Sequence, residues 1–245
     1  MMMSRIFVTG STDGLGKAVA QALMQQGHDM VLHARHHGRI EAVDALLSQG
    51  AEIVTGDLAD LSQTKAIAEH INRTGPVDVI IHNAGIISGK ALFQVNVVAP
   101  WLLSVLIARP SRMIFLSSSM HFDGRIPDTN ERWEKYISTV DYSDSKLLLT
   151  TLSFALARIW EDVVINAVDP GWVATKMGGV NAPDDFTKGI ETQQWLATAT
   201  DACALSSGGY WHYQKQREPH KETRNIAFQE ALLRYLEKIT GVKIQ

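Results

Sequence analysis

Tyr142 and Lys146 are residues whose types and spacing suit proton transfer. They stand four positions apart at the start of a strongly helical run, so on a helix both side chains point the same way from consecutive turns. A tyrosine normally loses its proton at about pH 10, and a nearby ammonium group stabilises the phenolate and lowers that pKa. The pair therefore predicts a general acid and base, although the same spacing also occurs on ordinary helix surfaces.

A glycine-rich turn near the amino end suits phosphate binding. Residues 6–8 predict a short buried strand, residues 9–16 follow as a G-x-x-x-G-x-G turn, and a helical run extends to Gln26. Glycines allow close approach of the backbone, and the free amides and dipole of a helix N-terminus favour an anion. The spacing differs from the G-x-G-x-x-G of many dinucleotide enzymes, and a plain tight turn is the alternative interpretation.

The residue after the second predicted strand bears on cofactor choice. Residues 30–34 form that strand, and Arg35 follows it without any acid at the strand end. An acid at this point binds the ribose hydroxyls of NAD, whereas an arginine accommodates the 2′-phosphate of NADP. Arg35 therefore predicts NADP(H), with NAD(H) less favoured. Asp13 points the other way, because it puts an acid close to that phosphate, and a solvated loop is the alternative role of Arg35.

Strands and helices alternate along the chain. Further strands are predicted at residues 52–55, 77–82, 112–116, 163–168 and 210–213. Continuous apolar strands indicate a parallel sheet that helices cover on both faces. We predict a doubly wound α/β fold of about seven strands in a single domain over residues 1–245, with ligands at the carboxyl ends of the strands. Loops are expected at residues 123–139 and 214–223, a mobile substrate flap at about residues 171–190, and an amphipathic C-terminal helix at about residues 224–240.

Composition limits the classes of function. The chain of 245 residues is 45% hydrophobic and 20% charged, as in an ordinary soluble globular protein. Its net charge of −3 without a basic block predicts no nucleic-acid or membrane partner. Cys203 is the only cysteine and cannot form an intrachain disulfide, which indicates a reducing compartment, most simply the cytoplasm. No signal peptide, membrane span or metal site is predicted.

Six features in register closely resemble the short-chain dehydrogenase/reductase family, in its compact non-extended branch. They are the turn at residues 9–16, Asn83-Ala84-Gly85, Ser118, the helix bearing Tyr142 and Lys146, Pro170-Gly171, and Thr175. The resemblance covers nearly the whole chain. It implies a Rossmann-like fold and an NADP(H)-dependent oxidoreductase that interconverts an aldehyde or ketone and an alcohol by hydride transfer.

The resemblance implies a catalytic tetrad of Asn96, Ser118, Tyr142 and Lys146. Tyr142 would donate the proton to the carbonyl oxygen in reduction and remove it in oxidation, while Ser118 would stabilise charge on that oxygen. Lys146 would hold the nicotinamide ribose and lower the Tyr142 pKa, and Asn96 would position a proton-relaying water. Ser119 is the alternative to Ser118, and Asn96 could equally be a helix cap.

The resemblance also implies a cofactor site and an assembly. Gly10, Gly14 and Gly16 would cradle the pyrophosphate, and Thr175 would bond the nicotinamide carboxamide. The full expected set is Gly10, Ser11, Thr12, Gly14, Leu15, Gly16, Arg35, Asp57, Leu58, Asn83, Ala84, Gly85, Tyr142, Lys146, Pro170, Gly171, Val173 and Thr175. By family analogy, the helices that bear Asn96 and Tyr142 would pair in a homodimer or homotetramer.

Two departures from the family pattern bear on the substrate. The segment between Gly85 and Asn96 is short, which predicts a reduced pocket wall. The segment between Ser118 and Tyr142 is long and would build up another wall. Its aromatic residues are Phe122, Trp133 and Tyr136, and the expected pocket residues are Ser118, Met120, His121, Trp172 and Met177. Such a site suits a lipophilic carbonyl compound, although these side chains could equally cover the sheet.

Two other functions use a similar fold. A non-catalytic NADP-binding redox sensor or regulator would need none of the four tetrad residues. A nucleotide-sugar epimerase or dehydratase uses a Tyr/Lys pair, but it requires a longer region after Pro170 and a different glycine spacing. The oxidoreductase is therefore the favoured prediction.

Overall fold

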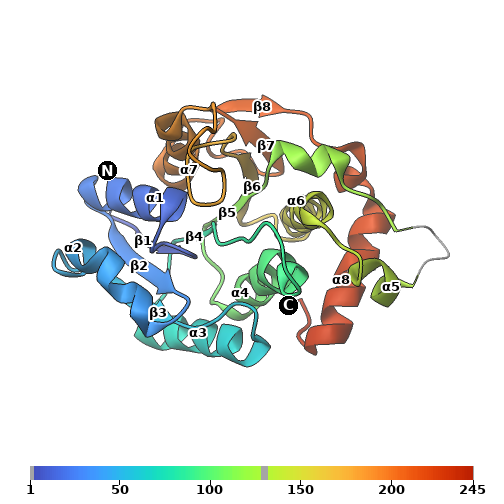
Figure 1. Ribbon diagram of the computed structural model, residues 1–245, viewed down its shortest axis with the longest axis horizontal. Coiled ribbons are helices and arrows are strands. Elements are labelled where there is room, and N and C mark those ends of the chain that lie inside the picture. Colours follow the sequence, from blue (N-terminus) through green and yellow to red (C-terminus); the bar gives the residue numbers. More distant parts are fainter. Residues whose placement is uncertain (1–2, 128–131, 245) are drawn as a thin grey trace.

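The computed structural model describes residues 3–127 and 132–244, which fold around one sheet (Figure 1). The strand order is β3-β2-β1-β4-β5-β6-β7-β8, and all neighbouring pairs are parallel except β7 with β8. The strands are β1 (Arg5–Val8), β2 (Asp29–Ala34), β3 (Glu52–Thr55), β4 (Val79–His82), β5 (Arg112–Leu116), β6 (Val164–Asp169), β7 (Gly209–His212) and β8 (Lys215–Arg217). The predicted Rossmann-like α/β class is confirmed, but the sheet has one strand more than expected.

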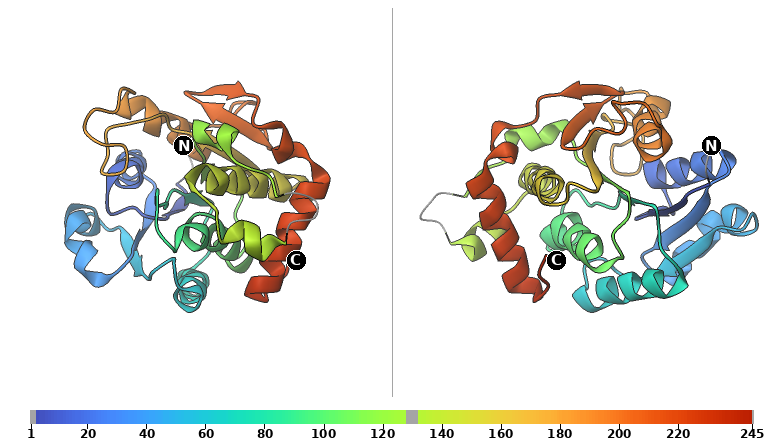
Figure 2. Two further views of the ribbon diagram at one scale, coloured as in Figure 1. Left: turned by 45° about the vertical axis from the view of Figure 1, so that its right-hand side comes forward. Right: turned by 180° about the vertical axis from the view of Figure 1, so that it is seen from behind.

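Helices cover both faces of the sheet, as the two views in Figure 2 show. The helices are α1 (Gly14–Gln25), α2 (Asp44–Leu47), α3 (Leu61–Thr74), α4 (Ala99–Leu106), α5 (Trp133–Ile137), α6 (Tyr142–Ile159), α7 (Phe186–Thr198) and α8 (Ile226–Thr240). Side chains of α1 and α7 share a core with Ile6 and Val8, whereas those of α3, α4 and α6 share one with Phe7. Successive strand residues point to opposite faces of the sheet, so Ile6 and Val8 contribute to one core and Phe7 to the other.

The strand register brings the site-forming residues to one edge of the sheet. β1 lies between β2 and β4, so the chain reverses its direction of winding at β1. Thr9, Asn83, Ser117 and Pro170 directly follow β1, β4, β5 and β6. Ligands of doubly wound folds bind outside the carboxyl ends of the strands at such a switch point.

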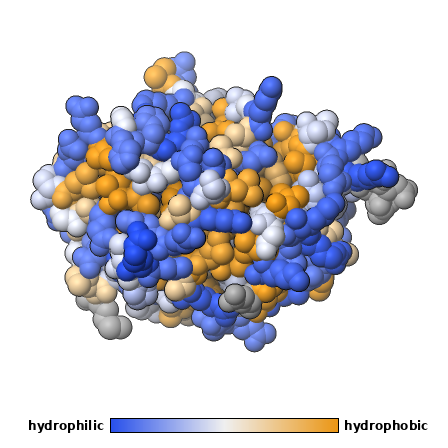
Figure 3. All heavy atoms as spheres, turned by 90° about the horizontal axis from the view of Figure 1, so that it is seen from below, coloured by the Kyte–Doolittle hydropathy of each residue, from blue (hydrophilic) through white to orange (hydrophobic). Residues whose placement is uncertain are grey.

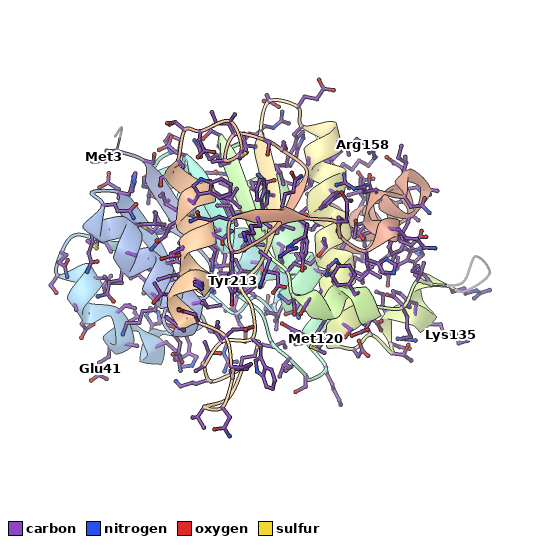
Figure 4. The ribbon with its side chains drawn as sticks, turned by 90° about the horizontal axis from the view of Figure 1, so that it is seen from above. Met3, Glu41, Met120, Lys135, Arg158 and Tyr213 are labelled. Carbon is purple, nitrogen blue, oxygen red and sulfur yellow. The ribbon has the colours of Figure 1, made fainter. Side chains whose placement is uncertain are left out.

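β7 confirms the strand predicted at residues 210–213, and β8 pairs with it as a hairpin within residues 214–223, where a surface loop was expected. Tyr213 and Gln214 connect them with left-handed φ angles of 51° and 58°, the conformation of a two-residue hairpin turn. Such turns usually contain glycine or asparagine, so this sequence lacks the signal that predicts them. The Gln214 N–H donates to Thr192 Oγ1 of α7 at 3.0 Å, and Figure 4 shows Tyr213 beside that helix.

α5 packs against α8 and replaces part of the loop expected at residues 123–139. The Trp133 ring stacks on Phe228 and Tyr235, with centroid separations of 6.2 and 5.2 Å. Tyr136 is buried, and its hydroxyl donates to the Arg125 carbonyl at 2.7 Å. The expectation that Trp133 and Tyr136 build a pocket wall is therefore wrong, because they form a layer with α8.

The surface on the side of α3 mixes apolar patches with hydrophilic side chains (Figure 3). No helix within residues 3–127 and 132–244 combines the length and the apolar character that a bilayer crossing demands.

Candidate active site

A cavity of about 590 Å³ opens at the carboxyl edge of the sheet. Fifteen of the residues expected from the sequence line it, drawn from the glycine turn, the strand ends, α6 and the flap: Gly10, Thr12, Gly14, Leu15, Arg35, Asp57, Leu58, Asn83, Ala84, Gly85, Tyr142, Lys146, Pro170, Thr175 and Met177. The chain thus brings the glycine turn and the Tyr/Lys pair to one space, although they are far apart in the sequence.

The glycine turn leads directly into the N-terminus of α1. Gly10 and Gly14 have φ angles of +65° and +50°, which side chains rarely adopt. A Cβ at Gly10 would lie 3.0 Å from the Ala84 Cα. The turn therefore presents bare backbone to the cavity, and a pyrophosphate fits this cradle because α1 directs its free amides there.

Thr9 and Asn83 hold the turn against β4. The Asn83 side-chain amide donates to the Thr9 carbonyl at 2.9 Å, and the Thr9 hydroxyl accepts the N–H groups of Asn83 and Ala84 at 3.0 Å. A Cβ at Gly16 would lie only 2.2 Å from Asn83 Nδ2. Gly16 therefore permits close packing of α1 on β4 instead of lining the cavity.

Three further expected cofactor residues lie behind the cavity wall. The buried Ser11 hydroxyl accepts the His33 N–H at 2.8 Å. Gly171 has a φ of +82°, and its N–H donates to Asp169 Oδ1 at 3.0 Å. Val173 is buried and forms a bridge with Asp184. These contacts shape the turn and the flap, so the structure does not place these three residues where a cofactor would touch them.

His33 is a cavity residue whose role the sequence did not reveal. His33 is buried near the end of β2 and lines the cavity. Its Nδ1 accepts the Gly10 N–H at 3.0 Å, and its Nε2 donates to the Gly56 carbonyl at 2.9 Å. Burial lowers its pKa below 6.5. The neutral ring therefore joins the glycine turn to the end of β3.

Acid should weaken the glycine turn through His33. Protonation makes Nδ1 a donor, which breaks its bond to the Gly10 N–H, so we expect NADPH affinity to fall only as the pH drops through the lowered pKa of His33, on the acid side of the ordinary histidine value. His33→Leu leaves that N–H unpaired at every pH and should weaken binding about tenfold at neutral pH. Fluorescence titration of NADPH against pH tests this, with His70→Leu on α3 as the control. A wild-type acid step that persists in His33→Leu would contradict the prediction.

Tyr142 and Lys146 lie side by side in the first turns of α6. Lys146 Nζ lies 5.5 Å from the centroid of the Tyr142 ring and donates to the Leu116 carbonyl at 2.7 Å. Burial raises the pKa of Tyr142 to about 12, although a hydrogen bond with Ser118 opposes the shift. Burial also lowers the pKa of Lys146 to about 8. The expected lowering of the Tyr142 pKa is therefore wrong for the cofactor-free chain, because burial outweighs it.

Asn96 lies at the centre of a π-helical turn (Gln94–Val98) before α4 and does not line the cavity. Its Oδ1 accepts the Ile86 N–H, and its Nδ2 donates to the Ile86 carbonyl and to Ser145 Oγ, all at 2.9 Å. Ser145 Oγ in turn donates to the Tyr142 carbonyl at 2.7 Å. The Asn96 side chain therefore links the end of β4 to the first turn of α6, and π-turns often mark functional sites.

Ser118 lies just after β5, and its side chain acts to lower the pKa of Tyr142 against the effect of burial. His121 is buried beneath it: Nδ1 donates to the Ser118 carbonyl at 2.7 Å, and Nε2 accepts the His220 N–H at 3.0 Å. Both ring nitrogens are thus used within the chain. The expectation that His121 touches substrate is wrong in this structure, where it supports the turn that holds Ser118.

The flap brings one of its expected pocket residues to Tyr142. Met177 Sδ lies 4.0 Å from the Tyr142 hydroxyl. Trp172 is instead 61% exposed, and its indole N–H donates to the Gly178 carbonyl at 2.8 Å. Met120 is also exposed and is labelled in Figure 4. The structure therefore places Met177, but not Trp172 or Met120, in the cavity wall.

A carboxylate and two cations meet at the entrance of the glycine turn. Asp13 caps α1 by accepting the Gly14 N–H at 2.8 Å. Its Oδ2 also pairs with Lys176 of the flap at 2.6 Å and with Arg39 at 3.2 Å. The Lys176 ammonium contributes most to holding the Asp13 pKa below its ordinary value, while burial opposes this. Sequence reasoning missed Lys176 because nothing in its neighbourhood signals a distant partner.

Comparisons with known proteins agree with this geometry. A family model described as short chain dehydrogenase matches residues 4–185. The chain is 36% identical to a short-chain dehydrogenase, chyC, of Penicillium rubens over 99% of both chains. It is 31% identical to a putative daunorubicin C-13 ketoreductase of a Streptomyces species, over 84% of this chain and 82% of that one. A blue fluorescent protein from a metagenomic library, solved with NADPH, shares the fold with a TM-score of 0.71 and 22% identity, over 85% of this chain and 95% of that one.

Proposed function

Because the chain belongs to the short-chain dehydrogenase/reductase family, we propose that it interconverts a carbonyl group and an alcohol with NADP(H), using Tyr142 as the general acid and base. One observation supports this above all: Tyr142 and Lys146 line the same cavity as a glycine turn at a helix N-terminus. A nicotinamide dinucleotide fits that cradle, and it supplies or accepts the hydride when bound. Residues 1–245 would form one domain, with residues 171–185 as the flap and residues 186–190 within α7.

Each tetrad residue has a role that its contacts suit. The Tyr142 hydroxyl donates its proton to the carbonyl oxygen, and the Ser118 hydroxyl bonds the same oxygen and stabilises its charge. The Lys146 ammonium stabilises the phenolate that Tyr142 becomes after it has given up its proton. Asn96 is a positioning residue, because its side-chain contacts run to Ile86 and Ser145. We propose these roles for the four tetrad residues.

The substrate would be a lipophilic aldehyde or ketone. Ile86, Ala91, Val95, Leu116 and Met177 give the cavity an apolar wall on the Tyr142 side, and such walls bind apolar molecules while a few polar groups orient them. The ketoreductase named above supports a ketone. Arg35 in the cavity and the NADPH-bound neighbour support NADP(H).

The test is NADPH oxidation against a panel of aldehydes, ketones and quinones, with NADH in parallel. Turnover that prefers NADPH is expected for at least one hydrophobic carbonyl compound. Tight NADPH binding without turnover of any compound would favour the redox sensor, and faster turnover with NADH would overturn the cofactor assignment.

Carbonyl reduction should depend on the protonation of Lys146. Its ammonium is charged below its pKa of about 8, while Tyr142 with a pKa of about 12 keeps its proton throughout this range. We expect kcat for reduction to be level below about pH 8 and to fall above it, whereas oxidation should rise with pH. Lys146→Arg stays charged and should remove the fall in reduction rate. A fall that survives in this variant would assign it to another group.

The family-based expectation of pairing through α4 and α6 conflicts with burial. Residues 99–104 and 143–156 are all buried, and α8 packs on α6. Trp101 Nε1 also donates to Thr240 Oγ1 at the end of α8. Neither helix offers a free face, so we propose a monomer. Light scattering after size exclusion should give the mass of one chain at micromolar concentration, and a dimer mass would contradict this.

A further inference from the structure

We propose that Lys176 and Arg39 bind the 2′-phosphate of the cofactor, and that Asp13 holds both cations in position for it. This inference rests on the proposed use of NADP(H). In that proposal Arg35 is the only residue that binds the 2′-phosphate, and the present inference adds two more cations. It also explains how Asp13, an acid close to that phosphate, is compatible with NADP(H).

Three separate parts of the chain converge on the Asp13 carboxylate. Oδ1 accepts the Gly14 N–H of the α1 N-terminus at 2.8 Å. Oδ2 pairs with Lys176 of the flap at 2.6 Å and with Arg39, in the 3-10 turn (His37–Val43) after β2, at 3.2 Å. Arg39 lies four positions beyond Arg35, at the strand end where the adenosine ribose of a dinucleotide binds. Arg39 therefore stands next to the ribose position, and Asp13 holds Lys176 close to Arg39.

The local charge suits a phosphate. Arg35, Arg39 and Lys176 line the main cavity, and Lys17 joins the latter two in an adjoining hollow of about 460 Å³. The carboxylates that line the same two spaces are Asp13, Asp57 and Glu41. Four cations and three carboxylates leave one net positive charge for an anion.

A phosphate can replace Asp13 as the partner of Lys176 and Arg39. The Lys176 side chain is 77% exposed and that of Asp13 is 42% exposed, and exposed pairs of this kind contribute little free energy. A phosphate offers more charge and more acceptor oxygens than one carboxylate. Asp13 thus keeps Arg39 and Lys176 close together until the cofactor arrives, which explains why an acid is compatible with NADP here.

Lys176 also connects this phosphate to the substrate side of the cavity. Its neighbour Met177 lies 4.0 Å from the Tyr142 hydroxyl. Its other neighbour, Thr175, approaches the glycine turn, where a Cβ at Gly14 would lie 3.4 Å from Thr175 Cγ2. A phosphate bound to Lys176 would therefore fix the flap beside Tyr142.

Calorimetric titration with 2′,5′-ADP and 5′-ADP tests the assignment without any turnover, because the two nucleotides differ in the 2′-phosphate. Lys176→Met should bind 2′,5′-ADP about tenfold more weakly than wild type and 5′-ADP with unchanged affinity. Lys188→Met is the matched control, since Lys188 is exposed at the start of α7 and lies over Tyr213. The control should match wild type at the same ionic strength.

Two results would overturn the inference. Unchanged binding of 2′,5′-ADP by Lys176→Met would show that the lysine does not meet the phosphate, and an equal loss for both nucleotides would place it elsewhere on the cofactor. A wild-type protein that binds 5′-ADP as tightly as 2′,5′-ADP would instead refute the proposed NADP(H) preference itself. The failure of the inference and the failure of the proposed function are therefore distinguishable.

Discussion

Tyr142→Phe should lower kcat for carbonyl reduction by about 10²- to 10⁴-fold, the usual contribution of a positioned general acid. The substitution removes only the hydroxyl, which lies 4.0 Å from Met177 Sδ, and keeps the ring beside Lys146. We therefore expect the dissociation constant for NADPH to stay within a few-fold of the wild-type value. Single-turnover rates with saturating NADPH, together with a separate binding titration, check both parts of this expectation.

The matched control is Tyr235→Phe, which removes a hydroxyl from α8, where the ring packs on Trp133. This variant should keep wild-type kcat. If Tyr142→Phe retained more than a tenth of the wild-type rate, the proton would come from another group, and Tyr142 would have only a structural role.

Arg125→Met should destabilise the fold by about 2 kcal/mol, because it leaves a buried carboxylate without its cation, although the Arg125 side chain is 51% exposed and solvent screens the pair. Asp144, in the first turn of α6, is fully buried. Its oxygens accept the Arg125 N–H at 2.6 Å, Nε at 3.1 Å and Nη2 at 2.5 Å. The Arg125 and Asp141 backbone N–H groups remain in the variant and still donate to Asp144, so the loss should fall below the range for pairs in which both partners are buried. Urea unfolding measures it.

Two further variants separate this effect from a general loss of surface charge. Arg158→Met breaks a pair with the partly exposed Glu230 and should cost less than about 1 kcal/mol. Adding Asp144→Asn to Arg125→Met should recover part of the stability, since a neutral amide is easier to bury. If Arg125→Met and Arg158→Met were equally stable, the buried pair would contribute nothing beyond a surface contact.

Local sequence patterns were sufficient for the parallel strands and for most of the helices. A continuous apolar strand, a glycine turn and a capped helix are each specified by neighbouring residues, so they can be recognised one at a time. β8 and the turn before it were missed, because Tyr213 and Gln214 adopt left-handed conformations without the residues that usually signal a hairpin turn. α5 was also missed, since its stability comes from the stacking of Trp133 on α8.

Some residues of the candidate site could likewise be recognised from local sequence, and others depend on distant partners. Its glycine turn and its Tyr/Lys pair have local spacing, and the order of parallel strands alone was enough to place them at one edge of the sheet. The roles of His33, His121 and Lys176 depend on partners at Gly10, His220 and Asp13.

Sequence by itself therefore determined the fold class, the family and the residue types that meet at the strand ends, because these follow from periodicity and short motifs. Only the tertiary structure decided which side chains line the cavity and which support it from behind, and it also decided the direction of the pKa shifts. Burial and long-range contacts set these properties, and neither exists until the strands and helices have packed.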